Sequence, residues 1–406
     1  MAGCKPKQTS NHVVQAVIVG NSMAPNLLGK HQTTVCSSCH FKIVSEVAAS
    51  TKRFVICPNC GAQVDIKETN LEPADLVNMT TGQLPERWQV IGFQRTGDNQ
   101  ASIKRVIGLP GEAVWFEHGN IFVQTKDSDP ILLKKNWKQQ KSTRVLIHDN
   151  RFQGRDSRWS LLESTSSLNT VLPKRFQTDL QWLRYQPKRC YEHLTAQRWS
   201  PRIEDAYGFN QSIRRQLNPV YEVCLEFEFD LESKSTQTGP TELLIAIIVG
   251  EQTYLARFEL NVQSVDVQLF NRDNQLVAGN NWRIDQGLLL CGISNIDQQI
   301  IVAVGDQQTH LLDLPPQNVN SRVEVLLSLQ PANPIDLKRV RLWRDTYYFS
   351  PILREELLRR QAGAGPAGTD GYFVVGDNLP VSQDSRSWPR PRVKAKDILG
   401  VVDIGQ

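Results

Sequence analysis

Hydrophobic residues alternate with polar residues, or gather in short runs, along most of this chain. Both patterns are typical of β-strands, because successive side chains of a strand point to opposite faces of its sheet. After residue 221, turn residues separate the runs at intervals typical of a two-sheet sandwich of the concanavalin-like or jelly-roll kind. The sequence predicts a mainly β fold, with strands at Trp88–Phe93, Ser102–Ile107, Ala113–Phe116, Asn120–Gln124, Tyr221–Asp230, Glu242–Val249, Thr253–Val262, Ile300–Val304 and Arg322–Leu329.

One helix is predicted close to the C-terminal end, at Pro351–Arg360. Ser350 can cap it, Pro351 suits its first turn, and Gly363 can end it. Residues 131–220 are rich in Arg, Gln and Trp and show no regular period, so we assign them only loosely to the second β unit.

The size and charge of the chain limit the possible functions. At about 150 residues per domain, 406 residues are typical of two or three domains. The 46 Lys and Arg residues and the 42 Asp and Glu residues leave a net charge of +4, too weak a field to indicate a nucleic-acid partner. The longest apolar runs, Val13–Gly20 and Leu243–Gly250, fall well short of the roughly 18 to 20 residues that span a bilayer. We therefore expect a globular protein in which no visible segment crosses a membrane.

Four of the eight cysteines form two C-x2-C pairs, at Cys36 and Cys39 and at Cys57 and Cys60. This spacing is typical of a zinc ribbon, in which four thiolates surround the metal as a tetrahedron. Two disulfides are the alternative, although the geometry of C-x2-C turns does not favour them. With four sulfur ligands no position remains open for water, so we expect one structural zinc ion and no catalytic cofactor.

Three separated segments carry the candidate chemistry. They are Gly20-Asn-Ser-Met-Ala-Pro-Asn-Leu-Leu-Gly29, Ile103-Lys-Arg-Val-Ile-Gly-Leu-Pro-Gly-Glu112 and Gly376-Asp-Asn-Leu-Pro-Val-Ser-Gln-Asp-Ser-Arg386. In the same order along the chain, they resemble the serine box, the lysine box and the distal box of type I signal peptidases. Neither G-x-S-x-G nor H-E-x-x-H occurs, so serine-histidine and zinc hydrolases are not favoured.

Ser22 and Lys104 are the predicted catalytic dyad. A serine hydroxyl is a weak nucleophile at neutral pH and needs a base within hydrogen-bond reach. A lysine can be that base when it is neutral, which requires burial among apolar neighbours such as Val106 and Ile107. We expect the Ser22 backbone N–H to stabilise the oxyanion; some family members add a hydroxyl two positions earlier, where this chain has Gly20, so the second donor stays unassigned.

The resemblance also assigns supporting roles to the distal box. It implies that Ser382 hydrogen-bonds the lysine amine and that Asp384 and Arg386 pair with each other to brace the end of the strand. Gly376, together with Asp377 and Asn378, would shape the adjoining turn. The alternative for Asp384 and Arg386 is an ordinary surface ion pair, worth less than about 1 kcal/mol.

What the resemblance implies is a serine endopeptidase that cleaves N-terminal signal peptides from exported preproteins after small side chains. Its antiparallel β catalytic core would comprise residues 1–31, 67–130 and 345–406. A zinc ribbon at 32–66 and a β-sandwich-like domain at 131–344 would be inserted into that core, as in the enlarged signal peptidases of planctomycete-type bacteria. The resemblance further implies a membrane surface as partner and a location at the cytoplasmic membrane.

Two other interpretations account for parts of the pattern. A self-cleaving serine-lysine protein of the LexA type uses the same dyad and should carry a DNA-binding domain before the serine box. A non-catalytic binding protein would use the β insertion to engage an unidentified carbohydrate or protein ligand on a relic of the protease core. Hydrolysis of a short peptide with alanine at P1 and P3 distinguishes an enzyme from a binding protein.

Overall fold

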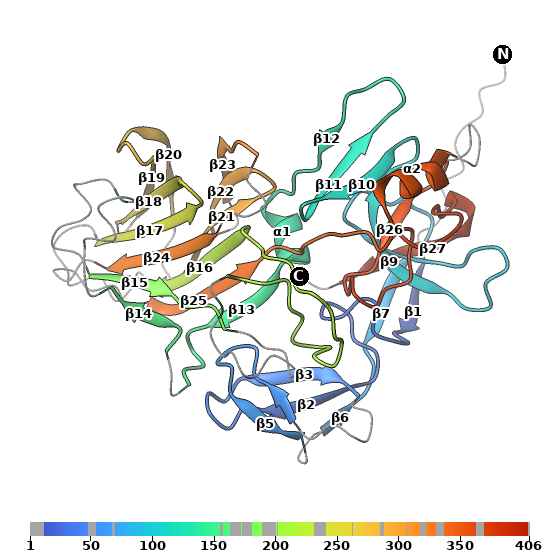
Figure 1. The fold of residues 1–406 in the computed structure, drawn as a ribbon, viewed down its shortest axis with the longest axis horizontal. Helices are drawn as coiled ribbons and strands as arrows, with labels where there is room; N and C mark the ends of the chain where they lie inside the picture. Colours follow the sequence, from blue (N-terminus) through green and yellow to red (C-terminus); the bar gives the residue numbers. More distant parts are fainter. Residues whose placement is uncertain are drawn as a thin grey trace.

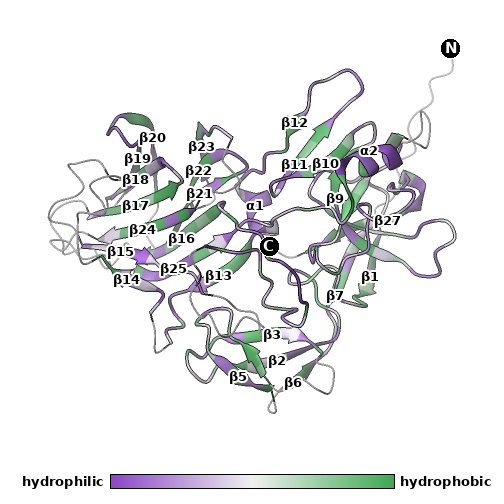
Figure 2. Ribbon diagram, viewed as in Figure 1, coloured by the Kyte–Doolittle hydropathy of each residue, from purple (hydrophilic) through white to green (hydrophobic). Residues whose placement is uncertain are grey.

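Figure 1 shows the fold as three groups of strands, with a large sandwich on the left, the predicted catalytic core on the right and the cysteine-rich ribbon below. In Figure 2 the most hydrophobic residues lie in the strands, and the connections are mostly hydrophilic. The structure is a computed structural model that describes residues 12–47, 54–66, 70–154, 157–162, 172, 181–188, 200, 202–230, 241–261, 263–284, 288–305, 307–316, 322–329, 337–362 and 369–404.

A six-stranded antiparallel sheet, in the order β1-β7-β27-β8-β9-β26, lies in the predicted catalytic core. Strands from both ends of the chain meet in it, because β27 lies between β7 and β8 and β26 pairs with β9. A smaller sheet of three strands and the helix α2 share a hydrophobic cluster with this sheet. The elements are β1 Val13–Val17, β7 Leu76–Thr80, β8 Val90–Phe93, β9 Ser102–Gly108, β26 Phe373–Val375 and β27 Ile398–Asp403, with β10 Ala113–Glu117, β11 Asn120–Gln124, β12 Ile131–Leu132 and α2 Arg354–Ala362 beside them.

The ribbon consists of short antiparallel strands between β1 and β7. One sheet has the order β3-β2-β6, and β4 pairs with β5 in a hairpin. Each C-x2-C pair lies in the turn of a hairpin, the first after β2 and the second after β4. The strands are β2 His31–Val35, β3 Lys42–Glu46, β4 Phe54–Ile56, β5 Gln63–Asp65 and β6 Asn70–Glu72.

Two antiparallel sheets of six and seven strands form the sandwich, with one shared hydrophobic core. In β16, alternate residues Val223, Leu225 and Phe227 are buried in that core, as the period-2 pattern predicts. The first sheet contains β13 Val145–Asp149, β25 Leu337–Arg344, β16 Val223–Asp230, β21 Leu288–Ile296, β22 Gln299–Val304 and β23 Gln307–Asp313. The second contains β14 Trp159–Leu161, β15 Gln181–Tyr185, β24 Val323–Leu329, β17 Thr241–Val249, β18 Gln252–Leu260, β19 Ser264–Phe270 and β20 Leu276–Arg283.

The mainly β class predicted from the sequence is confirmed, and several element boundaries differ. The predicted strand at Trp88 begins only at Val90, because Trp88 has a left-handed backbone with φ of 72°. Helix α2 begins at Arg354, since the hydroxyl of Ser350 accepts a hydrogen bond from the N–H of Ile352 in a turn before the helix. Gly363, its predicted end, and Val262, the predicted end of β18, lie outside the described residues.

The irregular stretch 131–220 contains a helix that the sequence pattern missed. Helix α1, Trp137–Thr143, has Asn136 as its N-cap, whose side chain accepts a hydrogen bond from the N–H of Gln139. The N–H of Asn136 donates in return to Gln139 Oε1, which completes a capping box. Neither α1 nor α2 has the length and apolar character needed to cross a membrane, and the same holds for every helix in the described part of the chain.

Candidate active site

The amine of Lys104, on β9, meets the hydroxyl of Ser22. Lys104 Nζ lies 2.7 Å from Ser22 Oγ and 2.9 Å from the carbonyl oxygen of Ile103. Lys104 is 5% exposed, and its burial lowers its pKa from 10.5 to about 8, while the carboxylates of Asp384 and Asp377 oppose that shift. The amine can therefore be neutral close to neutral pH and can accept a proton from the serine.

A tight loop between β1 and β2 holds Ser22. Met23 and Leu27 are buried behind the serine, and the N–H of Leu27 donates to the carbonyl of Met23 over 3.0 Å. Gly29 packs so closely that a Cβ there would lie 2.7 Å from the carbonyl oxygen of Gly20. Among the described residues, none accepts a hydrogen bond from the Ser22 backbone N–H. This N–H is thus available to a developing oxyanion.

The turn after β26 holds the other side of the Ser22 loop. The backbone N–H of Asn378 donates to the carbonyl oxygen of Ser22 over 3.0 Å, and its carboxamide Nδ2 donates to the carbonyl oxygen of Asn21 over 2.9 Å. A Cβ on Gly376 would lie 2.4 Å from the carbonyl oxygen of Ser22, so only glycine fits. The turn expected from Gly376, Asp377 and Asn378 therefore contacts the nucleophile loop directly.

Asp377 forms a two-point ion pair with Arg105, the residue after Lys104 on β9. Arg105 Nε and Nη2 each lie 2.7 Å from a carboxylate oxygen of Asp377, and Asn26 Nδ2 donates to the same carboxylate over 2.8 Å. Arg105 is 1% exposed. Sequence reasoning missed the roles of Arg105 and Asn26, although both belong to the quoted boxes. Their positions next to Lys104 and near Ser22 were the available signal.

Asp384 and Arg386 form the expected ion pair, and it is buried. Arg386 Nε and Nη2 each lie 2.8 Å from a carboxylate oxygen of Asp384, and the two residues are 0% and 1% exposed. Asp384 also accepts a hydrogen bond from the N–H of Gly376 over 3.0 Å, and Arg386 donates to the carbonyl oxygen of Leu379. The pair therefore fixes both ends of the turn, unlike an exposed surface ion pair.

The predicted hydrogen bond between Ser382 and the lysine amine is absent. Ser382 Oγ is buried and has no hydrogen-bond partner among the described residues. The hydroxyl packs against Gly376, where a Cβ would lie 2.2 Å from it, and the amine of Lys104 instead donates to Ser22 and Ile103. This part of the resemblance is wrong for the structure as it stands.

The dyad lies between two pockets of different character. Residues of β1, β7 and β9 line the larger one, which has a volume of about 450 Å³ and whose apolar side chains include Ile18, Met79 and Ile103. The other has a volume of about 320 Å³ and is lined by polar residues, among them Asn210 of the sandwich connection and Glu46 of the ribbon. Both segments that the sequence places outside the catalytic core thus reach the active site. No local sequence signal pointed to Asn210.

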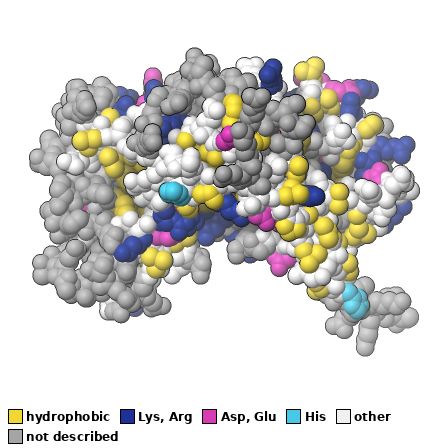
Figure 3. All heavy atoms as spheres, turned by 90° about the horizontal axis from the view of Figure 1, so that it is seen from below, with side chains coloured by type: hydrophobic (Ala, Val, Ile, Leu, Met, Phe, Trp, Pro, Cys, Tyr) yellow, Lys and Arg dark blue, Asp and Glu magenta, His cyan; other side chains and the backbone are white. Residues whose placement is uncertain are grey.

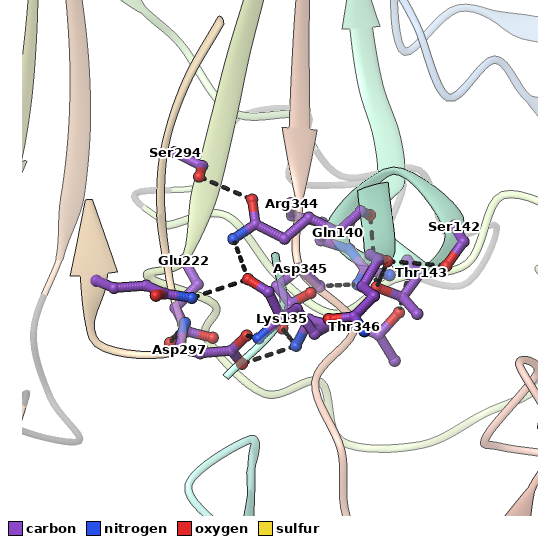
Figure 4. A network of polar contacts seen from close by, with 12 residues as sticks. Lys135, Gln140, Ser142, Thr143, Glu222, Ser294, Asp297, Arg344, Asp345 and Thr346 are labelled. Carbon is purple, nitrogen blue, oxygen red and sulfur yellow. Dashed lines mark hydrogen bonds and ion pairs between the residues drawn. The ribbon is translucent and has the colours of Figure 1, made fainter. Parts of the chain in front are cut away.

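A buried polar network surrounds Lys135 beside helix α1 (Figure 4). The amine of Lys135 lies 2.7 Å from Asp297 and 3.2 Å from Asp345, and these carboxylates raise the pKa of Lys135 against the effect of its burial. Helix α1 begins beside this cluster and ends near Ser142, whose carbonyl oxygen accepts a hydrogen bond from Arg105 Nη2 over 3.0 Å. The helix therefore connects the sandwich to the residue adjacent to the candidate base.

The four ribbon cysteines are brought together as a metal site requires. Their sulfur atoms all lie within 4.8 Å of one another, with 3.6 Å between Cys36 and Cys60 and between Cys39 and Cys57. A disulfide needs about 2.05 Å between its sulfurs, whereas zinc bonds of about 2.3 Å in a tetrahedron separate them by roughly 3.8 Å. All four thiols are free and buried, so the geometry fits zinc and not the disulfide alternative.

Comparisons with known proteins give one family match. Residues 11–172 match the family described as signal peptidase, peptidase S26, a segment that includes Ser22, the four ribbon cysteines and Lys104. A search of curated proteins found no match.

Solved structures resemble this chain only weakly. Sheep galectin-11 in complex with glycerol is 11% identical and covers 32% of this chain and 94% of its own, with a TM-score of 0.22. Porphyranase B from Zobellia galactanivorans is 7% identical and covers 46% of this chain and 85% of its own, with a TM-score of 0.24. TM-scores this low establish no shared fold.

Proposed function

We propose that this chain is a serine endopeptidase that removes N-terminal signal peptides from exported preproteins, because residues 11–172 match the family described as signal peptidase, peptidase S26. The family match supports a peptidase. The observation that carries the finer proposal is the 2.7 Å hydrogen bond between Lys104 Nζ and Ser22 Oγ in a buried site. Ser22 is then the nucleophile and Lys104 the general base.

The reaction proceeds through an acyl-enzyme. Neutral Lys104 removes the proton of Ser22 as the serine oxygen attacks the scissile carbonyl carbon, and the Ser22 backbone N–H donates to the oxyanion. The resulting ammonium of Lys104 gives the proton to the leaving amine, which departs as the peptide C–N bond breaks. Water then attacks the ester with Lys104 again as base, and the bond to Ser22 Oγ breaks as the proton returns to that oxygen.

Two features support an apolar peptide substrate that is presented at a membrane surface. The larger pocket adjoins Ser22, where the apolar side chains of Ile18, Met79 and Ile103 can contact an alanine side chain. The exposed residues Val17 and Val19 continue this apolar surface at the end of β1. Figure 3 shows hydrophobic side chains gathered on the catalytic-core part of the face seen there. Such a surface supports contact with a membrane, where signal peptides are presented.

We also propose that the ribbon binds one zinc ion through Cys36, Cys39, Cys57 and Cys60. Zinc would hold the two hairpins together and supply no open ligand position, so its role is structural. The ribbon stabilised in this way carries Glu46, which lines the polar pocket beside the dyad.

Cleavage of a short peptide with alanine at P1 and P3 tests the activity. Wild-type protein should cleave it at one bond, and Ser22→Ala and Lys104→Met should each abolish cleavage because neither nucleophile nor base can be replaced. Ser157→Ala, an exposed hydroxyl removed elsewhere, serves as control and should retain full activity. Comparable turnover by purified Ser22→Ala would refute the dyad, and a folded wild type without turnover would favour the binding-protein interpretation.

A further inference from the structure

A segment of the connection between two sandwich strands reaches the catalytic turn, which is the turn after β26 at residues 376–378. This segment, residues 202–222, lies between β15 and β16 and is held on both sides. The carbonyl oxygen of Phe209 accepts a hydrogen bond from the N–H of Glu46 over 3.1 Å, which fixes the segment to the ribbon. The hydroxyl of Tyr207 donates to the carbonyl oxygen of Asp377 over 3.2 Å, which fixes it to the catalytic turn.

Asn210 and Asn378 form a reciprocal pair of amides at this contact. Asn210 Nδ2 donates to Asn378 Oδ1 over 2.9 Å, and Asn378 Nδ2 donates back to Asn210 Oδ1 over 3.2 Å. The second hydrogen of Asn378 Nδ2 goes to the carbonyl oxygen of Asn21, over 2.9 Å. The two asparagines are 2% and 0% exposed, so these hydrogen bonds are buried.

This arrangement allows one orientation of the Asn378 carboxamide. The oxygen and nitrogen of an amide have nearly the same shape, so only hydrogen-bond partners decide which way it faces. The carbonyl oxygen of Asn21 can only accept, so it requires Nδ2 on its side. Asn210 then supplies a donor to Oδ1 and an acceptor to the second N–H of Nδ2, and so holds the carboxamide in that orientation. With the amide reversed, Asn378 Oδ1 would face the carbonyl oxygen of Asn21, and two acceptors would meet in a buried site.

We propose that Asn210 is a positioning residue for the nucleophile: by orienting Asn378 it holds the Asn21–Ser22 loop where Ser22 Oγ meets Lys104. This inference rests on the proposed function, in which Ser22 attacks the substrate. Asn378 is the direct link, because its backbone N–H and its carboxamide hold the carbonyl oxygens of both Ser22 and Asn21. Catalysis in this chain therefore depends on a residue from the inserted segment.

Peptide kinetics with a double-mutant cycle test the proposal. Asn210→Ala should lower kcat about ten- to a hundredfold, with a smaller change in KM, because a misplaced nucleophile slows the chemical step. Asn378→Ala should lower kcat at least as much. The double variant should be no slower than Asn378→Ala alone, since Asn210 acts through Asn378. Asn210→Ser, which keeps a short hydrogen-bonding side chain, provides a second variant if the alanine variant folds poorly.

Gln211→Ala is the matched control. Gln211 is the next residue and is 2% exposed like Asn210. Its side chain makes three hydrogen bonds of its own, with the backbone N–H and carbonyl of Ile56 in the ribbon and with the carbonyl of Gly208. Its loss should weaken the ribbon contact and leave kcat within about twofold of wild type. An equal fall of kcat in Gln211→Ala and Asn210→Ala would show general loosening and would overturn the proposal.

Amide hydrogen exchange tests the same inference without catalysis. In Asn210→Ala, peptides that contain residues 20–25 and 376–382 should exchange at least about tenfold faster than in wild type, because the Asn378 N–H loses its fixed acceptor. In Gln211→Ala the faster exchange should fall on residues 54–57 instead. If wild type cleaves no peptide but Asn210→Ala still shows this faster exchange, the result would count against the proposed function alone. Unchanged exchange of residues 20–25 in a folded Asn210→Ala would overturn the positioning role.

Discussion

Replacement of Lys104 by methionine should stabilise the catalytic core while it abolishes the candidate activity. Lys104 is 5% exposed, and its pKa falls from 10.5 to about 8 because burial penalises the ammonium form. At 1.36 kcal/mol per pH unit, this difference corresponds to roughly 3 kcal/mol of folding free energy lost at pH 7. Methionine has similar length and no charge, so Lys104→Met should recover most of this amount.

The pH dependence gives this prediction its specific form. Between pH 8 and 10.5 the unfolded chain binds more protons at this lysine than the folded chain does, so wild-type stability rises with pH across that window. Below pH 8 the full cost of the buried ammonium is present, and above pH 10.5 it is gone. The advantage of Lys104→Met over wild type should therefore be constant up to about pH 8 and shrink as the pH approaches 10.5.

Urea unfolding from pH 6.5 to 10.5 measures the difference in unfolding free energy between Lys104→Met and wild type. Hydrogen exchange in β8 and β9 serves as the probe, so that only unfolding of the core is counted. Lys135→Met is the contrasting variant, since Lys135 is 1% exposed but paired with Asp297 and Asp345. Removal of one partner from a buried ion pair costs about 3 to 5 kcal/mol, so this second variant should be destabilised. A Lys104→Met protein that is less stable than wild type at pH 7, or whose advantage does not depend on pH, would refute the reasoning.

Three further predictions concern the base, the metal and the insertion. Peptide cleavage should rise with pH through about 8, as Lys104 loses its proton, and a flat profile between pH 6 and 10 would argue against a lysine base. Elemental analysis should find about one zinc per chain, and removal of the metal by a chelator should speed hydrogen exchange in the ribbon more than in β9. Four thiols that react with an alkylating reagent, together with no detectable zinc, would contradict the site. Residues 131–344 expressed alone should give β-type circular dichroism and a cooperative unfolding transition, because the two sheets share a hydrophobic core. A disordered product would mean that the segment needs the catalytic core in order to fold.

The sequence was sufficient to predict the features that depend on local pattern. Alternating apolar residues placed β9, β11 and β16 within a residue or two of their ends, because burial on one face of a strand requires that period. The cysteine spacing predicted the four-sulfur cluster for a similarly local reason, since each C-x2-C turn brings its two sulfurs together. Strands β14 and β15 were missed because short strands in the irregular stretch 131–220 carry too few periodic residues.

Contacts between distant segments were beyond the reach of sequence patterns. Asn210 lies 168 positions from Asn378, and nothing around it distinguishes it from the many other polar residues of an irregular connection. The Ser382 prediction failed for a related reason: the resemblance supplied the residue type, but the hydroxyl packs against Gly376 and the lysine amine has other partners. A motif fixes which residues are present, whereas tertiary packing fixes which atoms meet.

The two buried lysines show how much of the chemistry depends on that packing. Lys104 and Lys135 are almost equally buried, yet the pKa of Lys104 is lowered and that of Lys135 is raised. The difference lies in the nearby carboxylates. Asp297 and Asp345 bond directly to the Lys135 amine, whereas the carboxylates of Asp384 and Asp377 are each engaged by an arginine. Because Arg386 and Arg105 occupy those two carboxylates, Lys104 is left with a hydroxyl and a carbonyl as hydrogen-bond partners. A neutral amine thus becomes attainable at the position where the proposed mechanism needs a base.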